Sequence, residues 1–342
     1  MSRRGVALPV LATLLVAVVL VAIGLGTVWI SPATTLRLIA SRLGIADQPD
    51  TPGSLAVILF ELRPPRVMLA ILVGAALAVA GPVFQAVFRN PMADPAIIGV
   101  SSGAALGAVV AILVTGSAFA GGLAVPLAAF AGAMATALLV YRIARIGPTV
   151  QVATLLLGGI AVAAVISAII TLVMSLSGEE IRSIYFWLLG GLAARGWNTL
   201  WAAAPLVAVG IVAALAAVRD LNVMALGEER AAQLGVEIER FKRLALATGA
   251  LLAGAAVSVA GVIGFVGLMT PHILRLVLGA DHRRLLPATV LGGALFMVLA
   301  DLAARTLLAP EEIPVGAVTA LLGGPFFLYL LRRERRVAGA RA

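Results

Sequence analysis

Long stretches without a charged side chain are the feature that most constrains the fold of this 342-residue chain. Several of them can cross a bilayer, because about 20 apolar residues span a hydrocarbon core of about 30 Å. A chain with 62% hydrophobic and 12% charged residues is also too apolar for a soluble domain. The sequence therefore predicts an all-α membrane protein. The charge-free intervals are residues 5–36, 67–88, 95–141, 146–178, 196–218, 244–274, 285–300 and 313–331.

Two of these intervals are long enough to hold more than one helix. Residues 95–141 exceed the length of one span, and we expect a break at the glycine-rich residues 116–122. We also expect a short separate helix in PHILRLVLG, set off by Pro271, because proline interrupts helices. This gives ten membrane helices, two of them short. The first interval is too long, and lacks a small-residue cleavage site, to be a removed signal peptide.

The basic residues predict the orientation of the helices. If the N-terminus is cytoplasmic, 17 of the 25 Arg and Lys residues lie on the cytoplasmic side and Arg275 lies within a span. This asymmetry follows the positive-inside rule and places both termini in the cytoplasm. The net charge of +9 then indicates loops that face an anionic lipid bilayer rather than nucleic acid. The seven on the other side are Arg37, Arg42, Arg63, Arg66, Arg182, Arg195 and Arg305.

A short sequence occurs twice, 180 positions apart. GAALAVAG at residues 74–81 returns as GAAVSVAG at residues 254–261. The first copy lies on the second helix, which runs inward, and the second copy on the seventh, which runs outward. This indicates an inverted repeat of helices 2–5 and 7–10, as transporters use around a central path. For the glycines we expect helix packing rather than substrate contact. They are Gly74, Gly81, Gly254 and Gly261.

One polar segment, residues 219–243, interrupts the second half of the chain on the predicted cytoplasmic side. Within it, GEERAAQLG at residues 227–235 predicts a short helix. Glycine stands at each end and acids stand in the first turn, as capping and the helix dipole favour. A rigid knob that contacts a partner and a solvated connector both remain open on these residues alone.

The chain shows no sign of its own catalytic chemistry. It has no cysteine, so disulfides and thiolate metal sites are excluded. A phosphate-binding P-loop needs lysine between glycine and serine or threonine, whereas the only lysine, Lys242, stands between Phe and Arg. We expect no catalytic residue, metal site or cofactor in this chain. His272 is expected to be structural, Asp301 to pair with Arg305, and Asp94 to cap a helix.

Three runs of residues resemble one family of membrane proteins. They are RPPRVMLAILVGAALAVAGPVFQAVFRNPMADPAIIGVSSGAALG, LGEERAAQLGV, and GVIGFVGLMTPHILRLVLGADHRRLLPATVLGGALF with the EIPVGAVTALLGGPFF that follows. These resemble the FecCD/BtuC-type permease subunit of iron-chelate and cobalamin ABC importers, over about residues 10–333. The resemblance implies a type II ABC importer permease, with residues 1–342 as one transmembrane domain in a bacterial inner membrane. It also implies a homodimer with two cytoplasmic ATP-binding subunits, which bind ATP and Mg²⁺, and a periplasmic substrate-binding protein.

The resemblance assigns roles to three groups of residues. Arg63, Arg66 and Arg305 would project into the periplasm and pair with glutamates of the binding protein. The coupling segment that meets the ATPase would comprise Leu226, Gly227, Glu228, Glu229, Arg230, Ala231, Ala232, Gln233, Leu234 and Gly235. Helices 5 and 10 would line the translocation path, with Leu155, Ser167, Met174, Gly316 and Thr319 in its wall.

The substrate and two other classes of function stay open at this point. We expect an iron chelate, haem or a ferric siderophore, ahead of cobalamin, although no residue decides among them. A proton-coupled secondary transporter would need a buried carboxylate at mid-membrane, and helices 1 to 8 carry none. A membrane scaffold or receptor that transports nothing is the third possibility.

Overall fold

The computed structural model describes residues 3–28, 30–42, 44–45, 53–116 and 122–339, and these are nearly all helical. Ten apolar helices within them match the expected number of spans. Eight are long enough to cross a membrane: α1 (Arg3–Gly24), α4 (Arg63–Phe88), α6 (Ala124–Ala144), α7 (Val152–Leu176), α9 (Trp197–Ala216), α12 (Ile238–Ala260), α14 (His282–Thr306) and α15 (Val315–Gly339). Two are shorter, α5 (Val100–Thr115) and α13 (Val266–Leu278).

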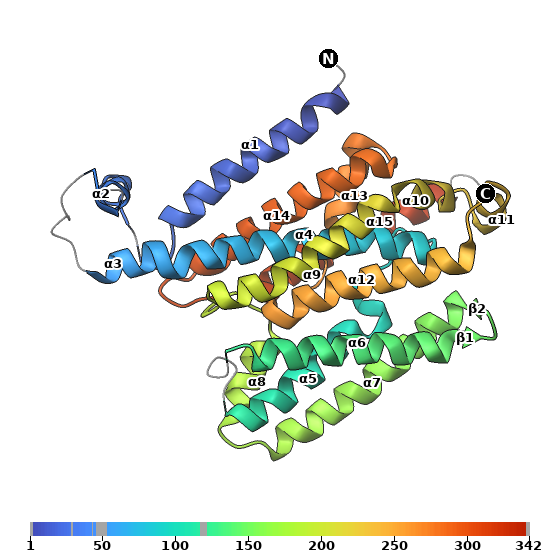
Figure 1. Ribbon diagram of the computed structural model, residues 1–342, viewed down its shortest axis with the longest axis horizontal. Helices are drawn as coiled ribbons and strands as arrows, with labels where there is room; N and C mark the ends of the chain where they lie inside the picture. The colour runs from blue at the N-terminus through green and yellow to red at the C-terminus, as the bar shows by residue number, and fades with distance from the viewer. Residues whose placement is uncertain (1–2, 29, 43, 46–52, 117–121, 340–342) are drawn as a thin grey trace.

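Short elements gather at the two ends of the bundle. At one end, the α11 end, lie α10 (Val218–Met224), α11 (Glu228–Gln233) and an antiparallel hairpin of β1 (Arg145–Ile146) and β2 (Thr149–Val150). At the other, the α3 end, lie α2 (Pro32–Arg42) and α3 (Gly53–Val57) (Figure 1). The remaining elements are a π-helical turn η1 (Ile58–Leu62), a 3₁₀ turn η2 (Pro95–Ile98) and α8 (Glu180–Leu188).

Two boundaries differ from the sequence-based expectation, and one agrees. The interval 5–36 is not one span, because α1 ends at Gly24 and α2 is a separate helix. The break in 95–141 is confirmed: α5 ends at Thr115 and α6 begins at Ala124, with residues 117–121 outside the described part. The short helix does not begin at Pro271, since α13 already starts at Val266.

Pro271 is accommodated inside α13 by a neighbouring helix. Proline has no N–H, so the carbonyl of Gly267, four residues earlier, lacks its helical donor. The side-chain amide of Gln85 on α4 donates to this carbonyl at 3.4 Å. The helix therefore continues through the proline, and α13 is hydrogen-bonded to α4 at the same point.

The two copies of the repeat lie on the central helices, α4 and α12. The most apolar windows of these helices are 83% and 72% buried, whereas those of α1 and α7 are 6% and 17% buried. The central helices run in opposite directions, since α4 starts at the α3 end and α12 at the α11 end (Figure 1). They pack against each other, and α14 also packs on α4 as α6 packs on α12. This arrangement is that of an inverted repeat.

The repeated glycines lie where helices approach most closely. A Cβ at Gly74 would meet the backbone of Gly293 and, at 2.6 Å, the side chain of Met297 on α14. A Cβ at Gly254 would meet the side chain of Met134 on α6 at 2.7 Å. Small residues permit such contacts, which drive helix association in lipid. The backbone contact confirms the packing interpretation of Gly74, whereas Gly254 lies against the flexible end of the Met134 side chain.

We predict that Gly81→Ala destabilises the fold by about 1–3 kcal/mol, because overpacking a tight contact costs that much. The new Cβ would clash with the backbone of Gly267 on α13. The matched control is Gly324→Ala on α15, where an added Cβ has no neighbour within 4 Å. Thermal unfolding in detergent measures both variants, and equal unfolding temperatures would contradict the packing role.

Candidate functional site

Two arginines at the α3 end bind the terminal carbonyls of α1. The guanidinium of Arg63, at the start of α4, donates to the carbonyls of Ile23 at 2.9 Å, Gly24 at 2.7 Å and Val28. Arg305, at the end of α14, donates to the carbonyls of Ala22 and Leu25 at 3.2 and 3.3 Å. The last carbonyls of a helix have no partner within it and carry partial negative charge. These contacts therefore attach the end of α1 to α4 and α14.

Asp301 lies at the centre of this group of charges. It is 1% exposed, and its two oxygens lie 2.9 Å from Nε of Arg66 and 3.0 Å from Nε of Arg305. Arg66 also contacts Glu312 at 2.9 Å. A charge is costly to bury unless it is paired, and here the acid stands between two cations. The expected pair of Asp301 with Arg305 is confirmed, and Arg66 joins it.

The three arginines do not project outward as expected. Arg63 and Arg305 are only 5% and 3% exposed, because their guanidinium groups point to α1 and Asp301. The side chain of Arg66 is 12% exposed and lies closest to solvent. All three nevertheless line one cavity of about 690 Å³ at this end. Their docking role stays a prediction, and Arg66 is the residue through which a partner could be reached.

A fourth arginine, Arg195, lines the same cavity and was given no role from the sequence. It lies between α8 and α9, and burial lowers the pKa of its guanidinium to about 10. Glu312 also lines this cavity. The sequence could have pointed to Arg195, because this arginine also lies on the side of the membrane where the positive-inside rule disfavours basic residues.

The α11 segment at the opposite end has the predicted form. α11 lies between Gly227 and Gly235, whose φ angles of +102° and +82° favour glycine. Ala231 of α11 is fully buried, and the rest of the coupling segment is exposed or half-buried. Leu226 and Leu234 are among the exposed residues. The contact of this segment with an ATP-binding partner stays a prediction.

Lys242 connects this segment to the rest of the α11 end. The lysine is 5% exposed, and its Nζ lies 3.1 Å from Glu228 of α11 and 3.3 Å from Glu239 of α12. The second oxygen of Glu239 accepts a hydrogen bond from the backbone N–H of Val150 in the hairpin at 2.8 Å. One network thus joins α11, α12 and the hairpin. The sequence showed the lone lysine but not its partner on α11, which is 14 residues away.

The five residues assigned to a translocation path do not meet in one cavity. Ser167 is exposed and Met174 half-buried on α7, while Gly316 packs against the backbone of Leu189. Two assignments need correction because they are buried within the subunit. Leu155 is 1% exposed between α6 and α12, and Thr319 is fully buried and donates to the carbonyl of Gly316 at 3.0 Å.

His272 and Asp94, which were expected to have structural roles, both make contacts within the subunit. His272 packs edge-on against Phe326 of α15, with ring centroids 5.8 Å apart. Asp94 accepts a hydrogen bond from the backbone N–H of Ala96 at 2.9 Å and caps η2, as expected. Burial raises the pKa of the Asp94 carboxyl.

We predict that Asp301→Asn destabilises the protein by about 3–5 kcal/mol, because it leaves the buried Arg305 without its anion, whereas Arg66 keeps Glu312. Glu237→Gln is the matched control, since Glu237 pairs with Arg240 across an exposed 3.7 Å contact. Such surface pairs contribute at most about 1 kcal/mol. Thermal unfolding of the two variants distinguishes them, and a neutral Asp301→Asn would show that Asp301 does not hold this end together.

We predict that Lys242→Met increases amide hydrogen exchange in residues 226–236 by about tenfold, because a hydrogen bond to a charged group contributes about 1.5–3 kcal/mol. The control is Arg240→Met, which removes an exposed cation from the same helix. Hydrogen–deuterium exchange with mass spectrometry measures both. Unchanged exchange in the Lys242 variant would mean that α11 is held by apolar contacts alone.

Comparison with known proteins identifies the family. The FecCD transport family matches residues 14–333. The chain is 50% identical to the cobalamin import system permease protein BtuC of Halobacterium salinarum, over 84% of this chain and 77% of that one. It is 44% identical to the hemin transport system permease protein HmuU of Yersinia pestis, over 80% and 83% of the two chains.

A solved structure agrees with these relatives. It is described as an inward-facing conformation of a metal-chelate type ABC transporter. It matches 95% of this chain and 98% of its own, with a TM-score of 0.81 and 32% identity. Sequence and fold therefore agree over nearly the whole chain: this protein belongs to the FecCD transport family and is a permease of the ABC importer type.

Proposed function

We propose that two copies of this permease, two ATP-binding subunits and a periplasmic binding protein import a metal chelate across a bacterial inner membrane. Membership of the FecCD family over residues 14–333 is the observation that carries this proposal. The permease provides the path, and ATP and Mg²⁺ bind to the partner subunits. The α3 end and the α11 end of the bundle would supply the surfaces for the two kinds of partner.

The basic residues support a cytoplasmic location for the α11 end and for both termini. Arg145 lies in the hairpin, Arg219 in α10 and Arg230 in α11. Arg283 and Arg284, in the first turn of α14, also lie there, since Asp281 at the N-cap of this helix accepts a hydrogen bond from Asn222 of α10 at 2.8 Å. Basic residues concentrate on the cytoplasmic side of membrane proteins.

The exposed faces of two helices support a homodimer. The apolar windows of α7 and α15 are only 17% and 28% buried. Leu172 on α7 and Leu321 on α15 are 60% and 75% exposed. A path between two copies would use these faces, with Ser167 and Met174 of α7 in its wall. Their few polar groups would hold a chelate weakly, so specificity would rest with the binding protein.

The α11 end has the features that a coupling surface requires. Its exposed leucines and acids offer contacts to an ATP-binding subunit, and Lys242 fastens α11 to α12 and the hairpin. Movement imposed on α11 by the partner would therefore move the start of α12. At the α3 end, Arg66 and Glu312 would meet the binding protein, where paired charges fix the orientation of docking more than they add affinity.

The relatives support a proposal for the substrate class. Two of them are named for cobalamin and hemin import, and the similar structure is of a metal-chelate transporter. Cobalamin and haem are both macrocyclic metal chelates. We propose a substrate of this class, with ferric siderophores as the next candidates.

Reconstitution into proteoliposomes tests the function. We expect the permease, its ATP-binding subunit and its binding protein to take up haem or cobalamin only when ATP is present. Uptake should fall to background without the binding protein, and also with an ATP-binding subunit that cannot hydrolyse ATP. Uptake driven by a proton gradient without ATP would instead favour a secondary transporter, and no uptake of any chelate would favour a scaffold.

A further inference from the structure

An apolar slot of about 360 Å³ lies between α6 and α12 near the α11 end. Met134, Leu138 and Ala137 form its α6 wall, and Leu246 and Ala247 form part of its α12 wall. Leu138 and Ala247 are exposed, so the slot opens on the outside of the bundle. Both helices are long enough to cross the membrane. The slot is therefore accessible to a molecule dissolved in the bilayer.

A basic basin adjoins the slot at the same end. It is lined by Arg145 of the hairpin and by Arg240 and Arg243 of α12, all of them exposed. Tyr141 and Arg243 line both the slot and the basin, so the two are continuous. Tyrosine is common at the level where membrane meets water. The apolar wall thus ends at three guanidinium groups.

Two carboxylates also line the basin, and they leave an excess of positive charge. Glu239 is engaged by Lys242 and by the backbone N–H of Val150. Glu237 lies 3.7 Å from Arg240, and both side chains are more than half exposed. Such an exposed pair is weak and can be exchanged for another partner. Three arginines therefore face one carboxylate that is not otherwise engaged.

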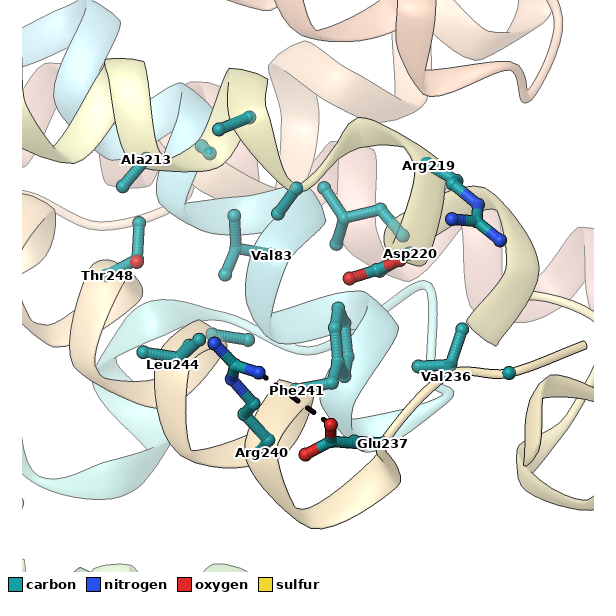
Figure 2. A pocket seen from close by; sticks show the side chains of 16 residues that line it. Val83, Ala213, Arg219, Asp220, Val236, Glu237, Arg240, Phe241, Leu244 and Thr248 are labelled. Carbon is teal, nitrogen blue, oxygen red and sulfur yellow. Dashed lines mark ion pairs between the residues drawn. The ribbon is translucent and has the colours of Figure 1, made fainter.

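The neighbouring groove between α9 and α12 provides a contrast. Figure 2 shows Arg219 and Asp220 on one side of this groove, and Arg240 paired with Glu237 on the other. Arg240 and Glu237 line both sites. The groove adds one cation and one carboxylate to this pair, whereas the basin adds two arginines and a glutamate that Lys242 already engages. Of these two sites, the basin on the α6 side of α12 is the one that combines an apolar slot with an excess of arginine.

We propose that the slot and basin together bind an anionic phospholipid of the cytoplasmic leaflet. An acyl chain occupies the slot between α6 and α12, and the phosphate of the headgroup lies among Arg145, Arg240 and Arg243. The forked guanidinium group suits phosphate oxygens, and basic pockets between membrane helices on the cytoplasmic side bind acidic lipids. A soluble partner could reach the arginines but not the slot, which lies within the membrane-spanning helices.

The charge requirement is tested by native mass spectrometry of the delipidated permease titrated with dioleoyl phosphatidylglycerol or dioleoyl phosphatidylcholine. We expect the anionic lipid to bind at least tenfold more tightly, and Arg145→Gln/Arg240→Gln/Arg243→Gln to remove that preference, because each arginine near the surface contributes about fivefold. The control Arg219→Gln/Arg283→Gln/Arg284→Gln removes equal charge from the same end and should keep it. Equal binding of both lipids to the unaltered protein, or equal loss in the control, would overturn the proposal.

The slot is tested separately with Ala247→Trp, which fills it with an indole. We expect this variant to lose phosphatidylglycerol binding by about tenfold, while Ala208→Trp on the exposed face of α9 keeps it. Gel filtration establishes that each variant is folded. If the arginine variant instead loses the ATP-binding subunit and keeps the lipid, the basin is a protein contact and the proposal fails. These binding measurements do not depend on the outcome of the uptake experiment.

Discussion

The fold depends on how closely the backbone of α4 approaches its neighbours. In lipid, apolar side chains gain little by leaving one apolar environment for another, so helices associate through tight packing and hydrogen bonds. The glycines of the repeat provide this packing, since a Cβ at Gly74 or Gly81 would meet the backbone of α14 or α13. The two central helices can then be buried on nearly every side. The surrounding helices keep exposed apolar faces.

Charged residues are arranged to support this core without disturbing it. At the α3 end, Asp301 forms ion pairs with two arginines, and Arg63 and Arg305 donate hydrogen bonds to carbonyls at the end of α1. At the α11 end, a single lysine joins two glutamates from different helices. A buried charge is tolerated only with such partners. Both surfaces proposed for partner contact thus lie on supports that are held by buried ion pairs.

The sequence predicted the number of spans, the inverted repeat and the short helix α11, because each depends on a local pattern of apolar or capping residues. It did not predict which charges are buried. In the sequence, Arg63 and Arg305 resemble surface arginines. In the structure they are buried against the end of α1, through contacts between residues about 40 and 280 positions apart. The buried positions of Leu155 and Thr319 also depend on packing between distant helices. Spacing along one helix carries no information about such contacts.

The hydrogen bond from Gln85 to Gly267 makes the effect of a substitution at Gln85 depend on the residue at position 271. Because Pro271 has no N–H, the carbonyl of Gly267 is free to accept the hydrogen bond from the Gln85 amide. The amide gains a buried acceptor, and the carbonyl gains a donor. Replacing the proline alone would give the carbonyl its own helical donor and leave a buried amide with less to bind. Replacing the glutamine alone would leave the carbonyl without a donor. The two positions should therefore tolerate change together better than separately.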